Sequence, residues 1–323
     1  MTRWLVRRVA QAALTFAIAV VLMFVLMRLA PGDPLSRLQD GRPMSPQEVA
    51  HLRQLYRLDQ PMAVQFVEFV RGVLSGDLGT SIEHGLPVTT LLASRLRPTL
   101  LLGGAAIFLN FTLGLWLGVR QAVRRGSRED RALTVVSLAG YAMPSFWLGL
   151  VLAWLVGIEL RWLPVAGMRD PLLAPDAPWA ARALDVAAHL VLPALTLSIV
   201  TIAGTMRYQR TALLEVLRLP YIGTARAKGL PERAVVWRHA WRNALFPVIT
   251  LFGLWLPLLV TGSVFVEMVF AWPGLGSLAA NAASSRDYPL VMGAALLAAG
   301  LVVTTSLLTD LAYALLDPRV RYS

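Results

Sequence analysis

Apolar residues gather in six long runs along the chain, and polar or charged segments separate the runs. About 20 helical residues, at about 1.5 Å each, cross a hydrocarbon core of about 30 Å. The pattern therefore predicts an all-α polytopic membrane protein with six transmembrane helices. We expect the spans at about 9–29, 98–119, 133–157, 187–206, 245–270 and 289–312.

Composition supports a membrane protein over a soluble one. The 323 residues are 56% hydrophobic and 15% charged, and the mean hydropathy is +0.60. A soluble domain is usually about 25% charged. There is no cysteine, so disulfides, thiol catalysis and cysteine-ligated metals are excluded.

The distribution of charge predicts the orientation in the membrane. The net charge is +11, and Lys228 is the only lysine among 30 basic residues. With the N-terminus inside, the inner segments sum to +13 and the outer segments to −1. Cytoplasmic loops are rich in arginine and lysine, so we expect both termini inside. This distribution also makes nucleic-acid binding unnecessary as an explanation of the basic total.

The first span follows Arg3, Arg7 and Arg8 and could be read as a signal peptide. Its apolar stretch is too long for one, and Ala30-Pro31-Gly32-Asp33-Pro34 ends the helix without a cleavage motif. We therefore expect an uncleaved first helix. The predicted organisation is a first helix with a long outer loop over 1–97, a five-helix core over 98–316 and a short cytoplasmic tail over 317–323.

Small and polar residues inside the spans predict a packed bundle. Gly114 and Gly118 form a G-x-x-x-G pair on one helix face, which permits close contact with a neighbouring helix. Asn110 places a polar side chain at membrane depth.

The first outer loop has helix signals of its own. Ser45-Pro46-Gln47-Glu48 fits a capping box and predicts a helix over about 46–57. A second helix is predicted over 61–74, and Gly76, Gly79 and Gly85 then interrupt the chain. The loop is either an external cap on the spans or a surface that receives a partner or a substrate.

The inner loop over about 207–244 predicts a short helix between two breaks. We expect Pro220 to end the helix of the fourth span, and Tyr221 to Lys228 to form about two helical turns. Gly229 suits the left-handed position after a helix, and Pro231 suits the first position of the next one. So short a helix is not stable alone in water and must pack on something. The loop is either a basic lipid-surface segment or a docking helix for a cytoplasmic partner.

At this loop the sequence resembles the dipeptide, oligopeptide and nickel permeases of ABC importers. Tyr221 to Leu230 is similar to their cytoplasmic "EAA" loop, whose three-letter motif falls on Gly223, Thr224 and Ala225 with only the alanine matching. The acid often found before the tyrosine is replaced by Pro220. Further similar strings lie in order along nearly the whole chain: 30–34, 76–79, 143–149, 239–244, 272–276, 286–289 and 317–319.

The resemblance implies the ABC importer type I permease fold and a place in a bacterial or archaeal cell membrane. It implies a second, homologous permease subunit, two cytoplasmic ATP-binding subunits and an extracytoplasmic solute-binding protein. It implies that a coupling helix inserts into the ATPase subunit. On this chain the helix comprises Tyr221, Ile222, Gly223, Thr224, Ala225, Arg226, Ala227, Lys228 and Gly229.

Other chemistry finds little support in the sequence. No G-x-x-x-x-G-K-[ST] phosphate loop is present, and the four histidines lack zinc-ligand spacing. We expect no cofactor, no metal and no enzymatic activity in this chain. Glu267 and Asp310 are acids near the ends of predicted spans. Each is either a structural partner in an ion pair or a group that couples transport to an ion gradient. The second role would make the chain an ion-gradient-driven secondary transporter, the alternative function.

Overall fold

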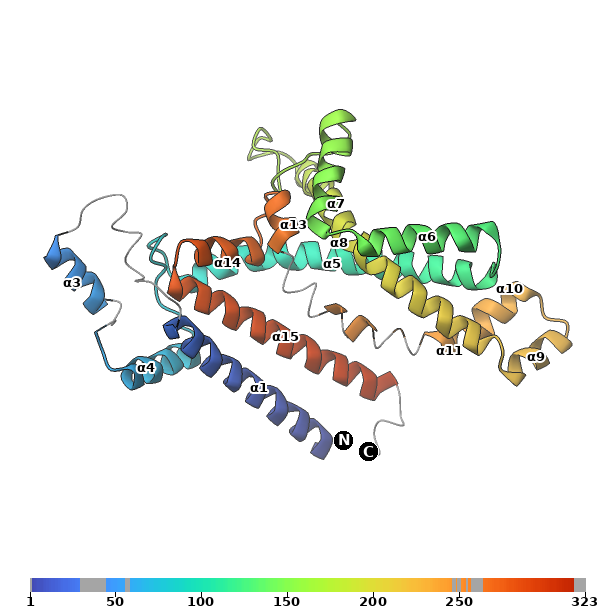
Figure 1. Ribbon diagram of the computed structural model, residues 1–323, viewed down its shortest axis with the longest axis horizontal. Coiled ribbons are helices and arrows are strands. Elements are labelled where there is room, and N and C mark those ends of the chain that lie inside the picture. The colour runs from blue at the N-terminus through green and yellow to red at the C-terminus, as the bar shows by residue number, and fades with distance from the viewer. Residues whose placement is uncertain are drawn as a thin grey trace. The chain divides into compact units, whose positions relative to one another are not determined.

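The computed structural model describes residues 2–29, 45–55, 59–245, 248, 251–253, 255–256 and 264–316. The regular structure in these ranges is helical, apart from one isolated bridge between Thr80 and Pro87 (Figure 1). The chain forms two compact units. The first contains Met1–Thr99 and Pro273–Leu307, and the second contains Leu100–Trp272 and Leu308–Ser323.

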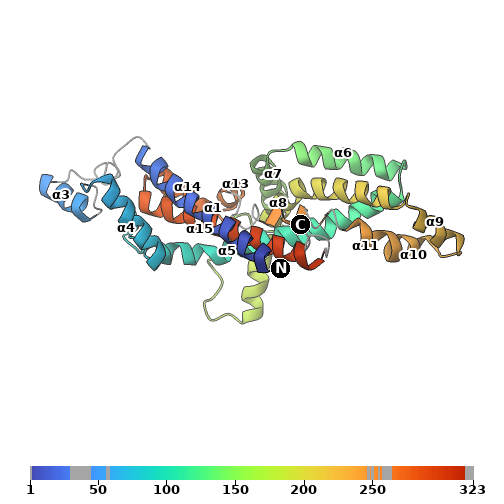
Figure 2. The same cartoon turned by 90° about the horizontal axis from the view of Figure 1, so that it is seen from below.

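In the first unit two long helices lie side by side. Helix α1 spans Thr2–Leu29 and α15 spans Tyr288–Leu316, and Phe16 of α1 packs next to Gly300 of α15 (Figures 1 and 2). Helix α14 (Leu275–Ser284) and the first turns of α5 (Val88–Val123) complete this part of the core. Its buried residues are Val88, Leu92, Leu275, Leu278, Ala282, Leu290 and Ala294.

The predicted helices of the outer loop are confirmed. Helix α3 covers Pro46–Leu55, and Ser45 and Glu48 form the expected capping box. The Glu48 N–H donates to Ser45 Oγ at 3.2 Å, and the Ser45 N–H donates to Glu48 Oε2 at 2.8 Å. Helix α4 covers Met62–Ser75 and ends at Gly76, which has φ +75°. The aromatic ring of Phe24 in α1 packs on two phenylalanines of α4.

A buried carboxylate fixes the loop that follows α4. Asp287, which is 1% exposed, accepts hydrogen bonds from the Ser81 hydroxyl and from the Glu83 N–H. Its other oxygen accepts the Leu290 N–H at 3.2 Å and so caps α15. One side chain therefore joins residues 81–83 to the start of a long helix.

In the second unit α5 and α8 (Trp179–Val216) pack closely in parallel. Every fourth residue of α5 from Leu102 to Ala122 is buried, including Asn110, Gly114 and Gly118. A Cβ atom at Gly118 would lie 2.7 Å from the Met206 carbonyl oxygen of α8, so glycine is required there. The predicted close contact is confirmed.

The third predicted span, over 133–157, is broken into two helices and is not one continuous helix. Helix α6 (Arg128–Ala142) is followed by α7 (Ser145–Leu152) and the π-helical turns of η1 (Ala153–Glu159), with a bend of 106° between α6 and α7. Met143 and Pro144 have extended backbones at the bend. Proline disfavours a helical conformation in the residue before it, which explains the break.

Within the described ranges, four helices are long and apolar enough to cross a membrane, and the bent α6–α7 pair would make a fifth. They correspond to the predicted spans at 9–29, 98–119, 187–206 and 289–312, and each helix is longer than its predicted span. The predicted span at 245–270 lies partly outside the described residues, and α13 (Val264–Val269) falls within it. The structure is therefore that of a helical protein with four or five candidate spans.

Candidate functional site

The short helix predicted between two breaks is α9, Pro220–Ala227. The preceding helix α8 ends at Val216, so the expectation that Pro220 ends it was wrong. Pro220 is instead the first residue of α9, after Leu219 in an extended conformation. Proline suits this position because its fixed φ is already helical and the first N–H needs no helical partner.

The end of α9 is a Schellman turn around Gly229. The Gly229 N–H donates to the Arg226 carbonyl at 2.9 Å, and the Leu230 N–H donates to the Ala225 carbonyl at 3.4 Å. Gly229 has φ +77°, which glycine adopts without steric cost. The left-handed conformation predicted for this residue is confirmed.

The chain restarts as α10 (Glu232–Ala234), η2 (Val235–Ala240) and α11 (Trp241–Ala244). Pro231 has an extended backbone and precedes the first helical residue, so its predicted place inside that helix was wrong by one position. Glu232 does lie in the first turn, where the helix dipole favours an acid.

Two buried apolar side chains anchor α9 to the rest of its unit. Ile222 is 0% exposed and Ala225 is 6% exposed, and their spacing places both on one helix face. In both views α9 lies at the end of the α5, α6 and α8 group (Figures 1 and 2). The remaining buried members of the cluster are Val119, Ala122, Ala212, Leu213, Val235, Val236, Ala240 and Ala244.

The other seven predicted site residues are exposed: Tyr221, Gly223, Thr224, Arg226, Ala227, Lys228 and Gly229. At Gly223 an added Cβ would meet no atom within 4 Å, so the described fold does not require glycine there. The helix thus divides into a buried anchoring face and a broad exposed face. Such an exposed face is accessible to another protein.

Polar contacts hold the exposed face in place. The Tyr221 hydroxyl accepts a hydrogen bond from Asn243 Nδ2 of α11 at 2.6 Å. Arg226 donates to both carboxylate oxygens of Glu232, at 3.1 and 2.7 Å. These bonds lower the pKa of Glu232 and raise that of Arg226. Arg226 is therefore held by its own chain, whereas Lys228 has no ion pair with any described residue.

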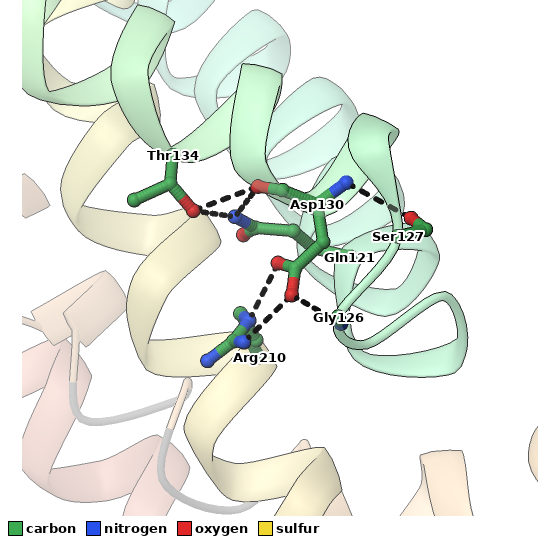
Figure 3. Close-up of polar contacts among 6 residues, drawn as sticks. All are labelled: Gln121, Gly126, Ser127, Asp130, Thr134 and Arg210. Carbon is green, nitrogen blue, oxygen red and sulfur yellow. Dashed lines mark hydrogen bonds and ion pairs between the residues drawn. The ribbon is translucent and has the colours of Figure 1, made fainter.

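A polar cluster close to the buried cluster on which α9 packs was not predicted from the sequence. Asp130 in the first turn of α6 forms a two-point ion pair with Arg210 of α8 (Figure 3). The local signal was present in Ser127-x-x-Asp130, a capping pattern directly before an apolar run. The Asp130 N–H does donate to Ser127 Oγ at 3.1 Å. Nothing local identifies Arg210 as the partner.

The two acids considered for ion coupling lie in different elements. Glu267 is fully buried in α13, and Asp310 is half-buried in α15. Among the residues that the structure describes, no three histidine, aspartate or glutamate side chains are grouped as a metal site requires.

Two family profiles match the chain over almost its full length. The profile described as "binding-protein-dependent transport system inner membrane component" covers residues 110–322. The profile of the N-terminal part of the same membrane components covers residues 1–99.

Curated relatives match from end to end. The chain is 39% identical over 323 residues to the oligopeptide transport system permease protein AppB of Bacillus subtilis, covering 100% of both chains. It is 37% identical over 337 residues to the dipeptide transport system permease protein DppB of Escherichia coli K12, covering 100% of this chain and 99% of the relative.

A solved structure has a similar fold. A chain of the inward-facing MetNI methionine ABC transporter superposes with a TM-score of 0.53 at 20% identity, over 70% of this chain and 96% of that one. At this identity the likeness shows the fold alone.

Proposed function

The chain belongs to the family of inner membrane components of binding-protein-dependent transport systems, and we propose that it is a permease subunit of an ATP-driven peptide importer. The observation that supports this most strongly is the end-to-end match to relatives named as oligopeptide and dipeptide permeases. The solute is a peptide or a related small molecule. No finding favours the alternative of an ion-gradient-driven secondary transporter.

We infer the remaining architecture from the family and the sequence. The permease has six transmembrane helices in the type I importer arrangement, with both termini in the cytoplasm. It forms the pathway with a second, homologous permease. Two cytoplasmic subunits bind and hydrolyse ATP, because this chain has no phosphate loop. An extracytoplasmic binding protein delivers the peptide.

In this proposal α9 is the coupling helix that docks on an ATP-binding subunit. Its anchoring residues Ile222 and Ala225 transmit force into the bundle, because they share one buried apolar cluster with residues of α5, α8 and η2. Its exposed face offers Tyr221, Thr224 and Lys228 to the partner. A rigid helix between two breaks converts movement of the docked subunit into movement of the helices attached to it.

The test is peptide uptake by the complete transporter in proteoliposomes, with ATP hydrolysis measured in the same sample. Lys228→Glu reverses an exposed charge without touching the anchoring face. We expect uptake per ATP hydrolysed, or capture of the ATP-binding subunit, to fall by about tenfold. Gly229→Asp should act similarly, because aspartate strains the turn that ends α9.

The matched control is Arg182→Glu, an equal charge reversal at an exposed position near the other end of α8. This variant should couple normally. If Lys228→Glu and Gly229→Asp transport peptide with normal coupling and still capture the ATP-binding subunit, α9 is not the coupling helix. Uptake by the chain alone with an ion gradient and no ATPase would instead support the secondary transporter.

A further inference from the structure

An ion pair between a buried aspartate and a half-buried arginine joins α6 to α8, close to the cluster on which α9 packs. The carboxylate of Asp130 accepts hydrogen bonds from Arg210 Nε at 3.1 Å and from Arg210 Nη2 at 3.0 Å (Figure 3). Asp130 is 5% exposed, and the arginine side chain is 29% exposed. A two-point arginine–carboxylate contact fixes orientation as well as distance.

The same aspartate also holds the turn between α5 and α6. Its Oδ2 accepts the Gly126 N–H at 2.9 Å, and its carbonyl accepts bonds from Gln121 at 3.2 Å and from Thr134 at 2.8 Å. Gln121 belongs to α5, so the hairpin of α5 and α6 is tied together at this point. Asp130 therefore connects the hairpin turn with α8.

The position of Arg210 relates this connection to α9. Ala212 and Leu213, which follow it on α8, pack in the buried cluster that holds Ile222 and Ala225. Separating a buried aspartate from its arginine leaves an uncompensated charge in a poorly solvated place, so the separated state is strongly disfavoured. The hairpin and the end of α8 consequently resist moving apart.

We propose that Asp130 and Arg210 are positioning residues for energy coupling. They make the α5–α6 hairpin and the α9-bearing end of α8 one rigid body, so that force applied at α9 reaches α5 and α6 together. This inference rests on the proposed coupling role of α9. It assigns a mechanical function to a pair that contacts neither the peptide nor ATP.

The neighbouring residue supplies a matched control. Glu129 also forms ion pairs, with Arg120 and Arg124, and both partners lie in the same hairpin. Glu129→Gln removes a charge and ion-pair contacts one residue away from Asp130, without breaking any contact to α8. If charge in this turn matters in general, Glu129→Gln and Asp130→Asn should have the same effect. If the link to α8 matters, only Asp130→Asn and Arg210→Gln should have an effect.

The first measurement is a distance between spin labels in the complete transporter. The chain has no cysteine, so Arg125→Cys in the hairpin turn and Arg218→Cys after α8 introduce a unique pair in it. Both positions are exposed. With cysteine-free partner subunits, we expect the same narrow distance distribution without nucleotide and with ATP bound. Asp130→Asn and Arg210→Gln should broaden it, and Glu129→Gln should not.

The second measurement is peptide uptake per ATP hydrolysed. We expect Asp130→Asn and Arg210→Gln to lower this ratio by about threefold or more, and the milder Arg210→Lys to lower it less. Glu129→Gln should keep the ratio of the unaltered protein.

Three results would overturn the proposal. One is a label distance that changes with nucleotide in the otherwise unaltered chain, because the two parts then do not form one body. Another is a normal uptake ratio in both variants with only the amount of folded protein reduced, which is a purely structural effect. The third is an equal loss of coupling in Glu129→Gln. The docking role of α9 is judged separately by Lys228→Glu, so a failure of the present proposal can be distinguished from a failure of that role.

Discussion

The loop around α9 and the loop that follows α4 are held in opposite ways. Residues 81–83 are fixed by the buried carboxylate of Asp287, with its hydrogen-bond partner Ser81 0% exposed. Helix α9 is fixed by two apolar side chains, and its own ion pair between Arg226 and Glu232 is largely exposed. A loop tied by buried polar bonds is suited to keeping one shape. A helix seated on an apolar patch keeps its outer face available to a partner.

The largest effect on stability should come from the buried apolar face of α9, formed by Ile222 and Ala225. Ile222→Ala removes most of a fully buried side chain, and such a change costs about 2–5 kcal/mol in the free energy of unfolding. We expect a lower melting temperature of the purified chain and a detached α9. Thermal unfolding measures the first effect. Labelling of a cysteine introduced at Ala225, which is buried in the unaltered fold, measures the second.

Thr224→Ala is the comparison for this change, because Thr224 is exposed and its hydroxyl donates to the Pro220 carbonyl of the same helix. It should alter stability by no more than about 0.5 kcal/mol. Equal stability of the two variants would show that Ile222 does not anchor α9.

A smaller effect is expected in the loop after α4. Asp287→Ala leaves the Ser81 hydroxyl and the N–H groups of Glu83 and Leu290 without this acceptor, which should cost about 1–3 kcal/mol. Thermal unfolding and protease cleavage within residues 76–87 should both report the loss. Uptake per ATP hydrolysed by the surviving transporter should stay normal, in contrast to changes around α9.

Asp77→Ala provides the control in the same loop, because Asp77 is exposed and accepts one local bond from the Gly79 N–H. It should be nearly neutral for stability. A normal melting temperature in Asp287→Ala would show that this carboxylate does not hold its loop. A loss of coupling in Asp287→Ala as large as that in Lys228→Glu would show that the two loops do not differ in function.

The contrast also explains which features the sequence could predict. Signals within one or two turns were read correctly, such as the capping box of Ser45 and Glu48, the helix end at Gly76 and the left-handed Gly229. The small-residue pair of Gly114 and Gly118 also predicted close packing, because two glycines on one face permit a neighbouring helix to approach closely.

Features that depend on distant partners were missed. Asp130 pairs with a residue 80 positions away, and Ser81 bonds one 206 positions away. Local pattern gives the type of such a residue but not its partner. The bend at Met143 and Pro144 was missed because hydropathy sets the length of an apolar run and not its direction. The Pro220 error was of the same kind, since proline fits both after one helix and at the start of the next.

The smallest effect should come from the exposed ion pair of the α9 loop. The Arg226 and Glu232 side chains are 44% and 56% exposed, so water screens them and their coupling free energy should be about 0.5 kcal/mol or less. Arginine lowers the pKa of Glu232, so this contribution is present above the unfolded pKa of about 4.3 and is lost as pH falls through the lower folded value. A double-mutant cycle of Arg226→Gln and Glu232→Gln, by thermal unfolding at neutral and acidic pH, measures both points. A coupling free energy above about 1.5 kcal/mol that persists in acid would mean that this pair anchors α9 as firmly as buried contacts do.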